Sequence, residues 1–155
     1  MPYERTQFGT LMAVGTLLGF AAAGFTLLFV VSPATREAVP WLSWALCGVL
    51  VAGFLLVGWM RVRVDERAIR AVMGVGLLRK SVEISDVRKA EVVRTRVLWG
   101  WGVHLTPAGW LYNVGGRWAV RLELASERAV LIGSDDPGGL HDAIEAARAA
   151  ANRPR

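Results

Sequence analysis

The residues with the most reactive side chains are few and far apart in the sequence. There are two histidines, His104 and His141, and a single cysteine, Cys47. Catalysis needs a nucleophile with a base held beside it, and zinc needs several His, Cys or carboxylate ligands together. His104 has no carboxylate or second ligand near it in the sequence, and no GxSxG, HExxH or P-loop motif occurs. We therefore predict no catalytic, cofactor-binding or metal-binding residues and a protein that is not an enzyme. An enzyme that uses His104 with a carboxylate is the alternative.

The most distinctive stretch is 109–116, Gly-Trp-Leu-Tyr-Asn-Val-Gly-Gly. Its last two glycines suit a tight hairpin turn, which requires no ligand. The side chains before them can instead present hydrogen-bonding groups at a rim where a peptide or a partner strand docks. The residues of this predicted binding rim are Trp110, Tyr112, Asn113 and His104.

Positive charge is concentrated in the C-terminal part of the chain. Residues 61–155 hold 16 of the 18 Lys and Arg residues and 11 of the 13 acidic ones, and so carry the whole formal charge of +5. Each basic group near an anionic leaflet contributes on the order of 1 kcal/mol to binding. The predicted lipid-facing basic residues are Arg61, Arg63, Arg88, Lys89, Arg94 and Arg96. Nucleic acid is not a predicted partner, because no nucleic-acid-binding motif accompanies the charge.

Two long apolar runs, at 8–31 and 41–60, contain no charged residue and are separated by a short polar loop. As one helix, the first would reach about 36 Å, enough for a hydrocarbon core of about 30 Å. We expect both to be transmembrane helices of a hairpin that forms an N-terminal unit, 1–60. A cleaved signal peptide is the alternative for the first run, which is longer than an ordinary h-region. The arginines that flank the runs predict a multi-pass protein of the bacterial inner membrane with both termini cytoplasmic.

Small residues recur within both predicted helices at helical spacing. They are Gly15, Gly19 and Ala23 in the first run, and Gly48 and Ala52 in the second. Small side chains let two helix backbones approach closely. These positions either seal the hairpin to itself or form a seam between copies of the chain.

The remaining segment, 61–155, has the pattern of short strands followed by one helix. Strands are expected at 61–65, 68–73, 77–84, 90–97, 99–106, 110–114, 117–125 and 129–133. Asp136 and Pro137 then suit the start of a C-terminal helix. The predicted fold is therefore α+β, with a transmembrane hairpin before a small antiparallel β-barrel or sandwich that a C-terminal helix closes.

The stretch from 99 to 144 resembles the bacterial membrane proteins that carry a PH-like (bPH) domain. The resemblance lies in Trp-Gly-Trp-Gly-Val-His at 99–104, the 109–116 stretch, the alternating strand at 120–124, Leu-Ile-Gly-Ser-Asp-Asp-Pro at 131–137 and the closing helix. It implies a PH-like fold behind a membrane hairpin. It implies no catalytic residues, because members of this family mostly lack a defined biochemical activity.

These observations favour a non-enzymatic docking or assembly module at the cytoplasmic face of the membrane. Its expected partners are the lipid bilayer and either another membrane protein or a second copy of the chain. Two alternatives remain: a peripheral module that senses anionic lipid through its basic residues, and an OB-type barrel behind a membrane hairpin, as in membrane proteins of the NfeD type.

Overall fold

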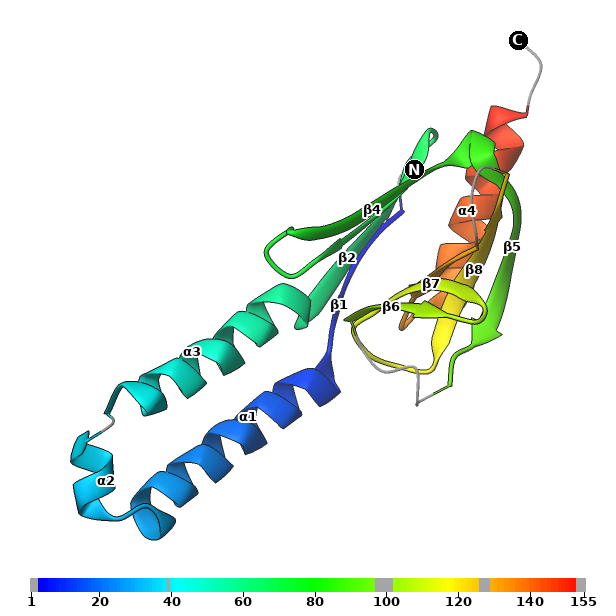
Figure 1. Ribbon diagram of the computed structural model, residues 1–155. Helices are drawn as coiled ribbons and strands as arrows, with labels where there is room; N and C mark the ends of the chain where they lie inside the picture. The colour runs from blue at the N-terminus through cyan, green and yellow to red at the C-terminus, as the bar shows by residue number, and fades with distance from the viewer. Residues whose placement is uncertain (1–2, 39, 97–101, 126–128, 153–155) are drawn as a thin grey trace.

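The computed structural model describes residues 3–38, 40–96, 102–125 and 129–152. Strands from both ends of the chain form a β-rich body, and two helices project from it as a long hairpin (Figure 1). The C-terminal helix lies against the body on the side away from this hairpin (Figure 1).

The first sheet contains four antiparallel strands in the order in which they occur along the chain. They are β1 (Tyr3–Phe8), β2 (Trp59–Val64), β3 (Ala68–Met73) and β4 (Leu78–Glu83). Along β2 buried and exposed residues alternate, so that Val62 is buried while Arg61 and Arg63 are exposed. This alternation gives the sheet one core face and one open face.

The second sheet has five strands in the spatial order β5-β8-β9-β7-β6. They are β5 (Val87–Arg94), β6 (Gly102–Thr106), β7 (Gly109–Asn113), β8 (Trp118–Leu124) and β9 (Val130–Gly133). A short 3-10 turn, η2 (Ile84–Asp86), links the two sheets. The strands pair antiparallel except for β7 and β9, which are parallel.

The main core lies between the two sheets and α4 (Pro137–Ala151). It contains Met60 and Ile69 from the first sheet, Leu122 from the second, and Leu140 and Ile144 from α4. The Asp136 side chain caps α4 by accepting a hydrogen bond from the Gly139 amide at 3.0 Å, as its position before Pro137 predicted.

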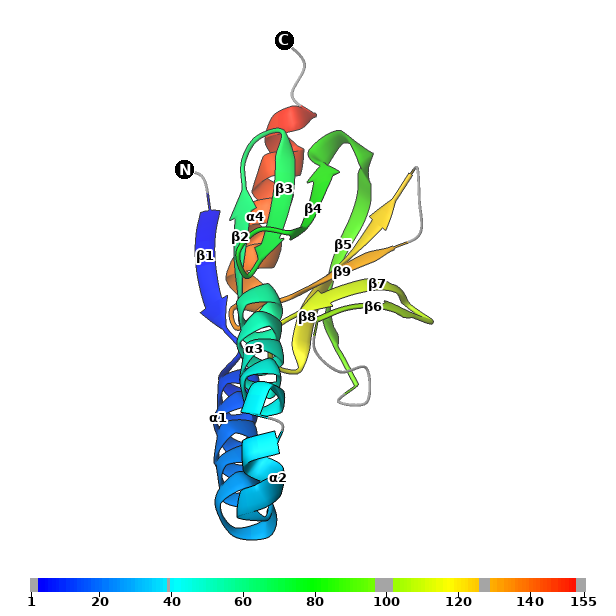
Figure 2. The same cartoon turned by 60° about the vertical axis from the view of Figure 1, so that its left-hand side comes forward.

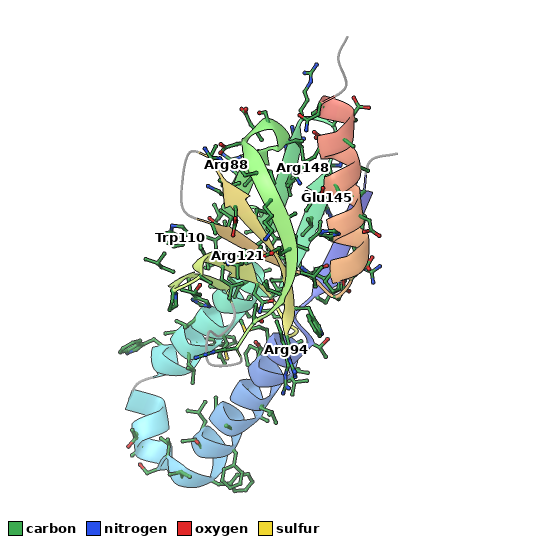
Figure 3. All side chains as sticks on the ribbon, turned by 90° about the vertical axis from the view of Figure 1, so that its right-hand side faces the viewer. Arg88, Arg94, Trp110, Arg121, Glu145 and Arg148 are labelled. Atoms are coloured by element: carbon green, nitrogen blue, oxygen red, sulfur yellow. The ribbon has the colours of Figure 1, made fainter. Side chains whose placement is uncertain are left out.

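Arg148 fastens α4 to the edge of the second sheet. Its guanidinium donates to the carbonyl oxygens of Val87 at 3.1 Å and Arg88 at 2.5 Å, and to the Glu145 carboxylate at 2.6 Å. Figure 3 shows Arg148 and Glu145 on the side of α4 that borders β5. These bonds satisfy backbone groups at a sheet edge that would otherwise be open.

The projecting hairpin leaves the body between β1 and β2. It consists of α1 (Thr10–Phe25), a π-helical turn η1 (Thr26–Val30), a short helix α2 (Pro33–Ala38) at the tip, and α3 (Pro40–Val57). α1 and α3 run side by side, and α2 lies at the end farthest from the sheets (Figures 1 and 2).

The prediction of two transmembrane helices at 8–31 and 41–60 is wrong. Within the described ranges, the structure contains no helix with both the length and the apolar character needed to cross a membrane. The first apolar run is divided between β1, the 16 residues of α1 and the π-helical turn, and the second contributes its last residues to β2. At 1.5 Å per residue, α1 reaches about 24 Å and the 18 residues of α3 about 27 Å. The predicted placement as a multi-pass protein of the bacterial inner membrane with both termini cytoplasmic is wrong for the same reason.

The predicted fold, an antiparallel barrel or sandwich of PH type behind a membrane hairpin, is also wrong. The described strands form two separate sheets, and the pairing of β7 with β9 is parallel. The individual strands were predicted better than their arrangement. The strand at 68–73 is β3, and the buried residues Val120, Leu122 and Leu124 alternate in β8 as expected.

The N-terminal strand β1 was not predicted, and it joins the hairpin to both sheets. It pairs with β2 along its whole length, from Tyr3 opposite Val64 to Phe8 opposite Trp59. The buried amide of Gln7 donates to the carbonyl oxygen of Gly133 at 2.6 Å and accepts from the amide of Asp135 at 2.9 Å. β1 therefore bridges the first sheet and the segment between β9 and α4.

We expect Gln7→Ala to lower the free energy of unfolding by about 1–3 kcal/mol, because the buried Gly133 carbonyl oxygen and the partly buried Asp135 amide both lose their bond to the Gln7 side chain. The measurement is urea denaturation of the purified full chain, with Thr6→Ala on the exposed side of the same strand as the control. Equal midpoints for the two variants would contradict the bridging role of Gln7.

Gly74 marks the place where the first sheet meets the end of α3. Its φ is +49°, and a Cβ there would overlap the backbone of Leu55 and Leu56. The Gly74 amide donates to the Trp59 carbonyl oxygen at 2.8 Å. The Val75 amide donates to the Leu55 carbonyl oxygen at 3.0 Å. A side chain at this position would force α3 away from the β3–β4 turn.

Gly74→Ala should therefore destabilise the fold by at least about 2 kcal/mol. Gly138→Ala is the matched control, since a Cβ at this position in α4 meets nothing within 4 Å, and it should be neutral or stabilising. Thermal unfolding of both variants measures the difference, and a Gly74→Ala chain as stable as the unsubstituted protein would show that the junction is not tight.

Candidate functional site

The hairpin carries most of the exposed apolar side chains among the described residues. They are Val14, Leu17, Leu18 and Phe25 of α1, Phe29 and Val30 of η1, and Trp41, Trp44, Leu46, Val49, Val51 and Leu55 of α3. Leu17 and Leu18 are consecutive, so they point about 100° apart around the helix. Apolar surface is therefore exposed on more than one side of the hairpin, where an ordinary surface helix has a single apolar stripe.

α1 and α3 are in contact with each other, and their glycines differ in how closely the other helix approaches them. Gly19 of α1 lies against Leu50 of α3, where a Cβ would be 3.4 Å from a Leu50 methyl group. A Cβ on Gly15, Gly24 or Gly48 would meet nothing within 4 Å. Of the predicted helix-packing glycines, Gly19 is the one whose Cβ position faces a side chain of the other helix. Ala23 is half-buried and Ala52 is exposed.

Backbone hydrogen bonds and aromatic rings hold the base of the hairpin. The Gly9 amide donates to the Gly58 carbonyl oxygen at 2.8 Å, which ties the start of α1 to the end of α3. The rings of Phe54 and Trp59 lie 6.0 Å apart at the same end. The direction in which the hairpin leaves the body is thus set by backbone hydrogen bonds at neighbouring strands.

A second exposed feature, which we call the arginine face, lies on the open side of the first sheet. It comprises Arg61 and Arg63 of β2, Arg70 of β3 and Arg79 of β4. Arg63 lies directly opposite Arg70, and Val72 separates Arg61 from Arg79 in the neighbouring row. Like charges directly opposite each other in a sheet are destabilising.

Two carboxylates form ion pairs with arginines of this face. Glu4 of β1 lies 2.7 Å from Arg63 and 3.8 Å from Arg61, and Asp65 lies 2.7 Å from Arg70. No ion pair of Arg79 occurs among the described residues, and its side chain is exposed. Glu83 of β4 is also exposed and lies on the same side of its strand as Arg79. Four positive and three negative side chains leave the face with a small net positive charge.

The other predicted basic residues lie on the second sheet or follow it. Arg88, Lys89 and Arg94 belong to β5, and the exposed Arg96 comes just after it. Figure 3 shows Arg88 and Arg94 toward opposite ends of this strand. Lys89 pairs with Glu91, which raises the pKa of the lysine and lowers that of the glutamate. The structure therefore does not bring these residues together with Arg61 and Arg63.

The four residues of the predicted binding rim have different environments. Asn113 is 2% exposed, and its side-chain oxygen accepts from the Gly115 amide at 3.1 Å. Tyr112 is half-buried against the main core, and the Nε2 atom of His104 is buried with no hydrogen-bond partner among the described residues. Trp110 is 40% exposed and lies on the side of the body away from α4 (Figure 3). Of the four, Trp110 alone has a largely accessible side chain.

A groove of about 800 Å³ separates α4 from the turn between β2 and β3. Alanines of α4 line one side of it, and its other side has a mixture of charges from Asp65, Glu66, Arg67 and Arg70. Its lining holds no nucleophile paired with a base. Within the described part of the chain, no cluster of three or more His, Cys, Asp and Glu side chains occurs.

In comparisons with known proteins, no family model and no curated protein matched this chain. The resemblance to bPH proteins consequently stays a prediction, and two parts of the stretch that carries it, 99–101 and 126–128, lie outside the described residues.

Sequence reasoning missed the contribution of Arg79, and it assigned Arg61 and Arg63 to a different set. The alternation of side chains along each strand contained the information needed to find this face. Arg61, Arg63, Arg70 and Arg79 fall on one side of three consecutive strands once the turns at 65–67 and 74–77 set the register.

Asp65 links the arginine face to the β2–β3 turn. It accepts hydrogen bonds from the amides of Arg67 at 2.9 Å and Ala68 at 2.8 Å, and these bonds lower the pKa of its carboxyl group. A lowered pKa in the folded state means that ionised Asp65 stabilises the fold above its ordinary pKa of about 3.9. This stabilisation is lost as the pH falls below that value.

Asp65→Asn should lower stability at pH 7 by no more than about 1 kcal/mol, since the side chain is partly exposed. The difference from the unsubstituted chain should shrink as the pH falls through the lowered pKa of Asp65. Chemical denaturation at neutral and acid pH measures this, with Glu66→Gln in the same turn as the control. A difference that is the same at all pH values would show that the charge of Asp65 is not responsible.

Proposed function

We propose that this protein is a non-enzymatic docking and assembly module whose hairpin binds the hairpins of other copies of the chain. The observation that carries the proposal is the apolar surface exposed on several sides of α1 and α3. Monomeric proteins seldom expose apolar patches larger than a few hundred Å², and larger ones mark interaction sites. The β-rich body then serves as the scaffold that orients the hairpin.

The composition of the hairpin favours a partner that is apolar throughout. Neither α1 nor α3 contains a charged residue. Burying these helices against one another therefore desolvates few polar groups, and each large side chain that is buried contributes about 1.5–3 kcal/mol. Four such side chains supply about 6–12 kcal/mol, comparable with the roughly 4–15 kcal/mol that association costs. A contact along one side of the hairpin is consequently marginal, which favours a bundle that covers several sides.

A second copy fits this requirement because it presents the same kind of surface. The open glycines, Gly15 and Gly24 of α1 and Gly48 and Gly53 of α3, lie where no side chain fills the space around them. A neighbouring helix approaches closely at such positions. Hairpins from two or more copies would therefore pack into one bundle, with the β-rich bodies at its end.

We expect the purified full chain to form a defined oligomer, and Leu17→Glu or Val49→Glu to weaken its association by at least about tenfold, because each places an unpaired charge in the buried contact. Both side chains are 68% exposed in the single chain. Analytical ultracentrifugation over a range of concentrations measures the association constant.

The matched control is Leu77→Glu in the turn between β3 and β4, where the side chain is 73% exposed but lies outside the hairpin. It should leave the oligomer unchanged. A chain that is monomeric, or that disperses only as one chain per detergent micelle, would overturn the self-association proposal and indicate that another apolar partner covers the hairpin.

A further inference from the structure

The arginine face has the features of a binding surface rather than of an ordinary solvated strand surface. Arg63 and Arg70 lie directly opposite each other, and the guanidinium of Arg79 adds a third positive charge in the next row. Glu4 is shared between Arg61 and Arg63. The repulsion that remains on this face would be relieved by an external anion.

The spacing of the arginines favours an extended anionic partner over a single small ion. Neighbouring strands are about 4.8 Å apart, so the backbones of Arg61 on β2 and Arg79 on β4 are separated by about 10 Å. The four residues occupy three strands and two rows of an open sheet. A surface that offers many phosphates matches this arrangement.

Apolar side chains border the arginine face at the end nearest the hairpin. Val75 and Leu77, in the turn that precedes β4, are 57% and 73% exposed. The Val75 amide donates to the Leu55 carbonyl oxygen at 3.0 Å, which holds this turn against the end of α3. Basic and apolar groups are therefore presented side by side at a fixed position.

We propose that the arginine face, with Val75 and Leu77 at its border, binds the phosphate groups of an anionic lipid surface from one side. Guanidinium groups pair with the phosphates, while the border side chains contact the apolar layer beneath the headgroups. This combination favours lipid over nucleic acid, whose phosphate backbone offers no apolar layer to receive Val75 and Leu77. The proposal requires no helix to cross the lipid, and it does not depend on self-association of the hairpin.

The test compares binding of the full chain to vesicles of phosphatidylcholine with and without phosphatidylglycerol, measured by flotation. The test variant is Arg61→Gln/Arg79→Gln, and the control variant Arg88→Gln/Arg94→Gln removes the same charge from β5. We expect the unsubstituted chain to prefer anionic vesicles. This preference should be lower by about tenfold or more in the test variant and unchanged in the control variant. Added salt should weaken this preference, because the contacts are exposed.

Binding to vesicles of phosphatidylcholine alone measures attachment through the hairpin, and sedimentation measures the oligomeric state. The self-association proposal and the lipid-binding proposal can therefore fail independently of each other. Circular dichroism and denaturation confirm that both double variants are folded. An equal loss in the two variants would overturn the proposal, because net charge alone would explain it. It would also be overturned if inorganic phosphate at millimolar concentration abolished binding, or if duplex DNA bound the arginine face while anionic vesicles did not.

Discussion

The pairing of β1 with β2 is the contact on which the rest of the structure depends. These two strands lie on either side of the hairpin in the sequence and pair along the whole length of β1. The pairing, together with the hydrogen bond from the Gly9 amide to the Gly58 carbonyl oxygen, brings the start of α1 and the end of α3 together. The helices then run side by side, with Gly19 of α1 against Leu50 of α3. Gln7 extends the same strand to the segment before α4. One short strand thereby couples the hairpin, both sheets and the C-terminal helix.

This connection places two different surfaces next to each other. The apolar hairpin continues directly into β2, and β2 contributes the first two arginines of the arginine face. The β3–β4 turn, held against the end of α3, adds apolar side chains at the boundary. The body has a packed core that contains Met60, Ile69 and Leu122. The hairpin, in contrast, exposes apolar side chains, and the arginine face carries unneutralised positive charge. The division between a stable scaffold and exposed contact surfaces is what favours a docking role.

The parts of the fold that were predicted correctly are those in which polar and apolar residues repeat with the period of the element and only one side of that element is buried. β8 is one example, because Val120, Leu122 and Leu124 alternate with Arg121 and Glu123 and pack into the core. The capped start of α4 at Asp136 is another. β1 was missed because its six residues, Tyr-Glu-Arg-Thr-Gln-Phe, have only one buried side chain, so it carries no alternating pattern. The candidate site was predicted in part: Arg61 and Arg63 were identified, but the sequence grouped them with residues of β5 that lie on another sheet.

By itself, the sequence determined several strands of the C-terminal part, the start of α4, where charge is concentrated and which long segments are apolar. Those properties depend on the residues themselves and on neighbours a few positions away. The tertiary structure alone decided that the apolar runs are divided among a strand, shorter helices and a π-helical turn, that the strands form two sheets with a parallel pair, and that four arginines share one open face. Each of these depends on the pairing of segments distant in the sequence, and local side-chain patterns do not specify such pairing.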